Sequence, residues 1–250
     1  MAVIARRQEW RALITRPQEE ADALVPALAA RGVGALIAPM MQIDFLPAVV
    51  DLGGVQAVLC TSANGVRALS RVCGERDVPL FAVGDATAAR ARQEGFRAVE
   101  SAKGNSLDLA QFVAHRLRPQ DGRLLHVCAS DVAGNLIGDL RERGFDTARS
   151  VLYEARPVAA LTALAIGALA AREIDFALFF SPRTAAIFTR LVDAAGVGGA
   201  RETIVALSIS AAADAALGDA TWRERRVARR PDQAALLDLL DEVLAERMRG

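Results

Sequence analysis

Short apolar runs alternate with longer amphipathic segments along most of the chain. Each run ends in a small or polar cluster, and the following segment repeats its apolar positions every three or four residues. This alternation predicts strands followed by helices, and such units form parallel sheets flanked by helices. The first strand is expected at Trp10–Thr15, the first helix at Gln18–Arg31 and the second strand at Gly34–Ala38.

Further strand–helix units follow, separated by two extended stretches that lack helical periodicity. The extended stretches are Pro39–Leu52 and Thr147–Val158. The predicted units are Ala57–Val72, Leu80–Gln93, Arg97–Arg116, Arg123–Arg143, Phe176–Ala194, Ile204–Leu217 and Val227–Met248.

Three of the strand-end patterns occur twice. Leu13–Pro17 pairs with Leu125–Asp131, Ala57–Gly65 with Phe176–Thr184, and Phe81–Thr87 with Ile204–Ser210. The members of each pair lie roughly 110–125 residues apart, which indicates two copies of one α/β domain rather than a short-period solenoid.

The order of the copies predicts a discontinuous first domain. The set that begins at Leu13 is completed only after residue 175, whereas residues 57–143 contain a whole set. We therefore expect residues 1–40 and 155–250 to form domain 1 and residues 44–151 to form domain 2. Two connecting strands near 39–46 and 150–158 would join them as a hinge, with a ligand cleft between the domains.

Polar residues at the strand ends indicate anion binding. In each unit the helix opens with Ser, Thr or Asp at the carboxyl edge of the sheet, where backbone N–H groups lack intrahelical partners. The chain has 30 basic and 30 acidic residues and a formal net charge of zero, which argues against binding nucleic acid or a membrane surface. Nearly all the basic residues are arginine, which holds carboxylates in a bidentate fork.

Several common mechanisms lack their sequence signatures. No phosphate loop, dinucleotide-binding GxGxxG, HExxH or GxSxG motif occurs, and neither a metal nor an organic cofactor is expected. His115 is expected on the surface of a helix, and His126 is expected as a satisfied core group rather than a base. No apolar run approaches membrane-spanning length, and residues 2–5 are too short for a signal-peptide core. Cys60, Cys73 and Cys128 show no CxxC spacing, so reduced thiols and a cytoplasmic location are expected.

With these residues in place, the chain resembles the uroporphyrinogen-III synthase family over roughly residues 11–245. The order and spacing of several short motifs carry this resemblance. They are Leu13–Pro17, Thr61–Val66, Ala82–Ala88, Val151–Glu154, Phe180–Pro182 and Val227–Pro231 followed by Leu236–Leu237.

The resemblance implies two α/β domains on a two-stranded connector and a reaction without a cofactor. Enzymes of this family close the linear tetrapyrrole hydroxymethylbilane, which carries eight carboxylates. Hydroxide leaves ring A, ring D attacks through its substituted carbon, and a spiro intermediate reopens and recloses with ring D inverted. Because uncatalysed closure gives the type I isomer, the enzyme must control the orientation of the bound substrate.

Residues of the strand-to-helix turns are the candidates for substrate binding. Ser62 and Ser181 occupy equivalent positions in the two copies and either hold carboxylates or only cap helices. Thr87 and Ser210 form the next expected pair. Arg16 and Arg183 each enter a helix directly after a strand, and each either clamps a carboxylate or is an ordinary exposed arginine. Asn64, Gly84 and Ser208 complete the predicted binding set.

Tyr153 is the only tyrosine and the only predicted catalytic residue. It matches the family's tyrosine, which the resemblance associates with departure of the ring A hydroxyl. A protonated phenol can donate to a leaving hydroxide. The alternative role is an amphipathic hinge residue packed between the domains.

The sequence departs from the family pattern at two places. Ser208 and Ser210 stand where a Gly followed by Thr is usual, and Cys128–Ala129 stands where bacterial relatives often carry Arg–Gly. Because of these departures, an inactive member of the family is one alternative function. A non-catalytic two-domain anion-binding protein is the other. A monomer is expected.

Overall fold

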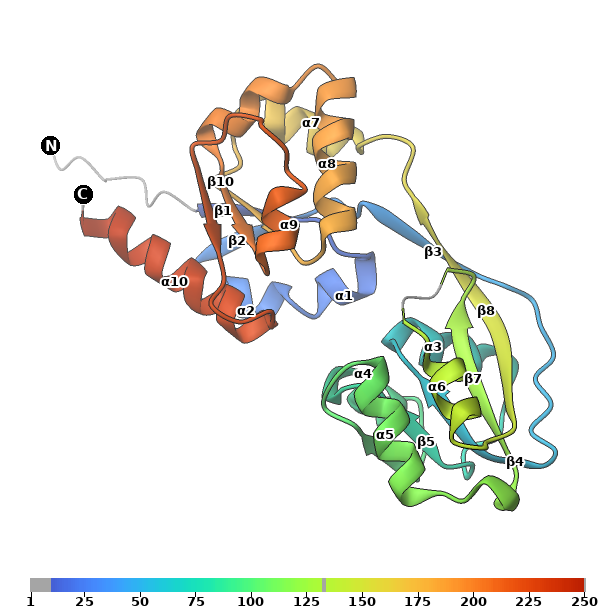
Figure 1. The fold of residues 1–250 in the computed structure, drawn as a ribbon. Helices are drawn as coiled ribbons and strands as arrows, with labels where there is room; N and C mark the ends of the chain where they lie inside the picture. Colours follow the sequence, from blue (N-terminus) through green and yellow to red (C-terminus); the bar gives the residue numbers. More distant parts are fainter. Residues whose placement is uncertain (1–9, 132–133, 250) are drawn as a thin grey trace, which may run out of the picture. The chain divides into compact units, whose positions relative to one another are not determined.

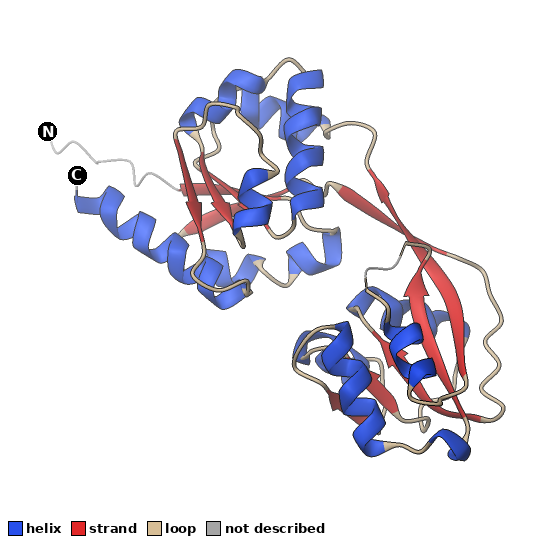
Figure 2. Cartoon of the chain, viewed as in Figure 1, coloured by secondary structure: helices blue, strands red, loops and turns tan. Residues whose placement is uncertain are grey.

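The structure, a computed structural model, describes residues 10–131 and 134–249. Residues 2–5, on which the expectation about a signal peptide rests, lie outside the described residues. The chain divides into two compact units, Met1–Gln42 with Pro157–Gly250, and Ile43–Arg156. Figures 1 and 2 show the elements of each unit.

The first unit contains a parallel sheet in the order β11-β10-β9-β1-β2. One face packs on α1, α2 and α10, and Phe188 of α8 contacts Phe179 on the other face. The strands are β1 (Trp10–Ile14), β2 (Val33–Ile37), β9 (Phe176–Phe179), β10 (Val205–Ser208) and β11 (Glu224–Val227). The helices are α1 (Gln18–Asp22), α2 (Val25–Ala29), α7 (Ala163–Ala170), α8 (Pro182–Ala194), α9 (Ala211–Ala215) and α10 (Gln233–Arg249), with a 3-10 turn at Gly198–Thr203.

The second unit contains a sheet in the order β3-β8-β7-β4-β5-β6. Alternate residues of its central strand pack in different apolar clusters, so α3 and α4 cover one face while α5 and α6 cover the other. The strands are β3 (Met41–Phe45), β4 (Val55–Cys60), β5 (Leu80–Ala82), β6 (Val99–Ser101), β7 (Arg123–Ala129) and β8 (Thr147–Pro157). The helices are α3 (Ala63–Val72), α4 (Asp85–Gln93), α5 (Ser106–Arg116) and α6 (Leu136–Glu142), with a 3-10 turn at Pro119–Asp121.

Apart from the additional β3, the two sheets share one strand order, which confirms the three sequence pairs at the level of whole strands. β9 lies between β10 and β1 in the first sheet, and β4 lies between β5 and β7 in the second. The equivalent strands are therefore β9 and β4, β10 and β5, and β1 and β7. Equivalent backbone hydrogen bonds occur in the two sheets. Val83 N–H donates to Cys60 O in the second unit, and Ile209 N–H donates to Phe179 O in the first.

The chain passes between the units within two strands, β3 and β8. These strands are hydrogen-bonded neighbours. Leu46 N–H donates to Leu152 O, and Val158 N–H donates to Met40 O, a pattern in which residue numbers rise on one strand and fall on the other. The two strands therefore run antiparallel.

A β-bulge interrupts the pairing of β8 with β7. Cys128 pairs with Val151, but the next residue, Ala129, pairs with Tyr153. Leu152 is the extra residue, and a bulge of this kind re-aims the side chains beyond it. As a result Leu152 and Tyr153, although consecutive, both pack in the apolar cluster that contains α3.

Two elements differ from the expectation. The single helix predicted over Gln18–Arg31 is two short helices, separated at Ala23–Leu24. Pro26 explains the break, because it has no N–H and its ring excludes a continuous helix through the preceding turn. The sequence pattern predicted no helix at α7. The helix is nevertheless capped by Thr162, which accepts a hydrogen bond from Ala165 N–H, and its sequence is rich in alanine and leucine.

His126 lies on β7 and is 1% exposed. Its Nε2 lies 3.4 Å from Thr61 Oγ1, while Nδ1 has no hydrogen-bond partner among the described residues. The prediction that His126 lies in the core is confirmed. The prediction that its hydrogen-bonding groups are all satisfied is not, because Nδ1 lacks a partner among the described residues. Burial, reinforced by the Arg149 cation, lowers the pKa of His126 from 6.5 to about 4.

We predict that this histidine makes the protein less stable in mild acid. The unfolded chain binds the proton near pH 6.5 and the folded chain only near pH 4, so between these values the unfolded state holds more protons. The free energy of unfolding should therefore fall by up to about 3 kcal/mol as the pH drops through this window.

Urea unfolding followed from pH 7.5 to 4 measures this slope. His126→Gln should flatten it, whatever its effect on stability at pH 7.5. His115→Gln is the matched control, because His115 is exposed on α5. Equal slopes in the wild type and His126→Gln would contradict the prediction.

Candidate active site

The strand-to-helix turns gather at one edge of each sheet, because the strands that precede them run parallel. Ser62 caps α3 after β4, and Ser181 caps α8 after β9. Gly84 caps α4 after β5, and Ser210 caps α9 after β10. In each unit the first N–H groups of two neighbouring helices therefore lie at the same edge.

Ser62 has two hydrogen-bond partners. Its Oγ accepts from Gly65 N–H at 3.0 Å, which closes the N-cap, and lies 2.7 Å from the hydroxyl of Tyr153. A side chain at position 65 would not fit freely, because a Cβ there would lie 3.2 Å from Val127 O. The close approach of α3 to β7 thus fixes the turn that carries Ser62.

Tyr153 lies on β8 directly after the bulge and is 6% exposed. Its ring packs in the apolar cluster with residues of α3, and its hydroxyl meets Ser62 at the start of that helix. The predicted catalytic residue and one predicted binding residue are therefore in direct contact within the second unit.

Ser181 has the same capping geometry but different partners. Its Oγ accepts from Thr184 N–H at 3.2 Å and lies 3.0 Å from the Thr184 hydroxyl. Pro182 occupies the first helical position and brings no N–H, so α8 has one donor fewer than α3. Arg183 follows in the same turn and is exposed.

Arg16 is held at the carboxyl end of β1 in a defined position. Its guanidinium lies 4.4 Å from the centre of the Phe180 ring and binds Glu20 at 2.8 Å and Gln233 at 3.0 Å. Phe180 directly precedes Ser181, so Arg16 lies beside the turn of the neighbouring strand. It is half-buried and oriented, unlike a freely moving surface arginine.

The predicted equivalence of Thr87 and Ser210 is wrong. The equivalent backbone hydrogen bonds in the two copies make Ser210 the equivalent of Gly84, and both residues are N-caps. Thr87 matches Ala213 instead, one turn into the helix, and is buried at 6% exposure. The sequence comparison was displaced by three residues, because both copies are rich in small residues there.

Ser208 cannot contribute a ligand contact as the structure stands. It is the last residue of β10, is fully buried, and has no partner for its Oγ among the described residues. Its equivalent in the other copy is Ala82. We therefore leave Ser208 out of the binding set.

Asn64 is also engaged inside the protein. It is 6% exposed, and its Oδ1 accepts a hydrogen bond from Arg67 on the same helix. Arg67 itself is only 7% exposed. Sequence reasoning did not select Arg67, although its i, i+3 spacing from Asn64 could have suggested the contact.

The departures from the family pattern at Cys128 and Ala129 lie within a strand. Cys128 and Ala129 are buried residues of β7 itself. Arg149 of β8 lies beside this site, with its Nη2 3.6 Å from Cys128 Sγ. Arg149 therefore places a guanidinium beside Cys128 on the neighbouring strand.

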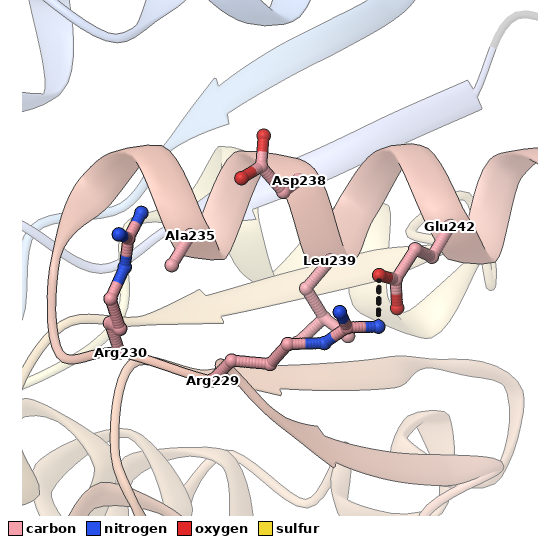
Figure 3. Close-up of a pocket in the computed structure, with 6 residues that line it drawn as sticks. All are labelled: Arg229, Arg230, Ala235, Asp238, Leu239 and Glu242. Atoms are coloured by element: carbon pink, nitrogen blue, oxygen red, sulfur yellow. Dashed lines mark hydrogen bonds and ion pairs between the residues drawn. The ribbon is translucent and has the colours of Figure 1, made fainter.

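The turn between β11 and α10 contains arginines that the sequence analysis did not select. Arg229 and Arg230 line a surface cavity of about 360 Å³ together with Asp238 and Glu242 (Figure 3). Arg229 binds Glu242 at 2.8 Å, and Arg230 binds Asp232 at 3.3 Å. In the sequence, the two consecutive arginines before Pro231 could have pointed to this turn. Both guanidinium groups already face carboxylates of this chain.

Within the described ranges, no group of three or more His, Cys, Asp or Glu side chains could hold a metal ion. Among the same residues, no helix is long and apolar enough to cross a membrane.

Solved structures of similar fold come from two bacteria. Uroporphyrinogen-III synthetase from Helicobacter pylori is 18% identical, with a TM-score of 0.65 over 94% of this chain and 99% of the other. A mutant uroporphyrinogen III synthase from Thermus thermophilus is 18% identical, with a TM-score of 0.52 over 95% and 99%. No curated protein matches the sequence.

These similarities define the class of the chain as a mixed α/β protein with parallel sheets flanked by helices. Residues 22–238 match the family described as uroporphyrinogen-III synthase HemD. The chain belongs to the uroporphyrinogen-III synthase family. Its reaction is the cyclisation of hydroxymethylbilane in tetrapyrrole biosynthesis, catalysed as a cyclising lyase.

We predict that Ser208→Ala leaves catalysis intact. The change removes a buried hydroxyl that has no partner among the described residues, and such a group costs about 1–3 kcal/mol when unsatisfied. The free energy of unfolding should stay constant or rise by about 1 kcal/mol, with kcat and KM unchanged. A fall of tenfold or more in kcat/KM would place Ser208 in the site after all.

Proposed function

We propose that the turns at the carboxyl edges of the sheets hold the carboxylates of hydroxymethylbilane, and that Tyr153 assists the departure of hydroxide from ring A. The observation that carries this proposal is the hydrogen bond of 2.7 Å between Tyr153 and Ser62. It puts the only phenol of the chain at the start of a helix, where N–H groups favour an anionic ligand.

Helix N-termini suit this substrate better than a strongly basic surface would. Each contact between an exposed helix end and a carboxylate contributes about 0.3–1 kcal/mol, and up to about 2 kcal/mol when partly buried. Several such contacts would fix the conformation of a flexible bilane, and conformation decides which carbon of ring D attacks. Binding through helix N-termini needs no excess of basic side chains, so it is compatible with a formal net charge of zero.

The proposed binding set follows from the positions of the side chains. Arg16 is already oriented and retains guanidinium N–H groups beyond those bound to Glu20 and Gln233. The turns capped by Gly84 and Ser210 offer backbone donors. We retain Ser62, Ser181 and Arg183 in this set. Asn64 is left out because its Oδ1 binds Arg67, Thr87 because it lies one turn into α4, and Ser208 because it is fully buried.

Tyr153 would act as a proton donor to the leaving hydroxide. Phenols are protonated at neutral pH and can donate to a developing hydroxide. The pyrrole nitrogen of ring A also drives departure, so the phenol would supply only part of the acceleration. Its position on β8 beside an apolar cluster favours a fixed donor over a mobile one.

We also propose that the protein acts as a monomer in the cytoplasm. Cys60, Cys73 and Cys128 are free thiols, and two of them are buried. Each sheet completes its own apolar core from this one chain. Sedimentation at catalytic concentration tests the monomer, since a mass near 53 kDa, about twice 26.5 kDa, would contradict it.

We predict activity in the absence of added cofactor. Purified protein given enzymatically generated hydroxymethylbilane should form mainly the type III isomer, in the presence of a metal chelator. Oxidation of the products and chromatographic separation of the type I and type III porphyrins measure the ratio. A mixture no richer in type III than the spontaneous reaction would support an inactive family member or a non-catalytic anion-binding protein.

We predict that Tyr153→Phe lowers kcat about 5–100-fold, at or below the low end of general acid catalysis. The ring still packs against its cluster, so stability and KM should change little. The product should remain mainly type III, because the conformation of the bound substrate is unchanged. Full kcat in this variant would remove Tyr153 from the chemistry.

A further inference from the structure

Ser62 and Ser181 are equivalent by strand order, by helix position and by capping geometry. Each accepts a bond from the third N–H of its helix. They differ in their second partner, which is Tyr153 for Ser62 and Thr184 for Ser181. The duplication therefore provides an internal comparison for the role of Ser62.

The Tyr153 hydroxyl is placed by two independent features. The bulge on β8 turns the side chain towards the face covered by α3. Ser62 then meets the hydroxyl at 2.7 Å, an ordinary distance for a hydrogen bond between two hydroxyl oxygens. The ring is held by packing, whereas the direction of the O–H is set by hydrogen bonding alone.

Ser62 is itself fixed by backbone. Gly65 N–H donates to its Oγ at 3.0 Å, and Gly65 lies close to the carbonyl of Val127 on β7. One lone pair of Oγ is thus occupied, and either the other lone pair or the hydroxyl proton makes the bond to Tyr153. A backbone donor, a serine and a phenol form a continuous chain at the start of α3.

We propose that Ser62 is a positioning residue for Tyr153, and that this role is separate from capping α3. The inference rests on the proposed catalytic role of Tyr153. Ser62 orients the phenol O–H before and during departure of the hydroxide, and it accepts or donates a hydrogen bond as the phenol changes its partner. Ser181 caps α8 in the same way but positions no catalytic group.

The first experiment needs no activity. Tyr153 is the only tyrosine, so protein labelled with ¹³C at tyrosine Cζ gives a single tyrosine signal. Ser62→Ala should move this signal, Ser62→Thr should restore it towards the wild-type position, and Ser181→Ala should leave it in place. Ser62→Gly is the second variant, because glycine retains most of the capping stability while it removes the hydroxyl. An unmoved signal in Ser62→Ala and Ser62→Gly would overturn the inference.

The second experiment is a kinetic cycle with Tyr153→Phe. Ser62→Ala should lower kcat about fivefold to tenfold, which corresponds to the loss of one hydrogen bond. In the Tyr153→Phe background the same change should alter kcat less than twofold. Ser181→Ala should raise KM about fivefold with kcat nearly constant. Equal effects of Ser62→Ala on kcat in both backgrounds would show that Ser62 acts independently of Tyr153.

The two experiments separate the inference from the proposed function. If the wild type forms no excess of the type III isomer, the proposed function fails, while the tyrosine signal still reports whether Ser62 orients the phenol. If the wild type is active and the signal of Ser62→Ala does not move, only the positioning role fails.

Discussion

Parallel pairing is the constraint on which the rest of the structure depends. Because β9 and β10 run parallel, and β4 and β5 do too, the turns that follow the two strands of each pair lie at the same edge of their sheet. The turns there expose helix N–H groups, so binding capacity follows from topology before any particular side chain is chosen. The antiparallel contact of β3 with β8 is the exception, and β8 is the strand that supplies Tyr153.

The sequence allowed the fold to be predicted well, because buried strands and amphipathic helices have different periods. Within the site, Ser62, Ser181 and Tyr153 could be selected from strand ends and motif order. Their contacts could not, since the link between Ser62 and Tyr153 depends on a bulge that shifts the register by one residue. The pairing of Thr87 with Ser210 failed for a related reason, because small residues do not fix an alignment to within one helical turn.

Ser208 shows a second limit of sequence patterns. It occupies the end of a strand, where a polar residue suggested binding, yet its side chain lies inside the protein. A strand alternates its faces regularly, but sequence alone does not reveal whether helices cover both faces at a given point. Here Ser208 is fully buried, and its hydroxyl is left without a hydrogen-bond partner among the described residues.

The division of the chain also has a consequence for the order of events during synthesis. The second unit is continuous, whereas β1 and β2 of the first unit are made before it and their partner β9 after it. At about 5–20 residues per second, the ribosome needs on the order of ten seconds to make the intervening segment. The second unit can thus fold while β1 and β2 still lack the three strands β9, β10 and β11 that complete their sheet, and chaperone binding during that interval would protect their apolar residues.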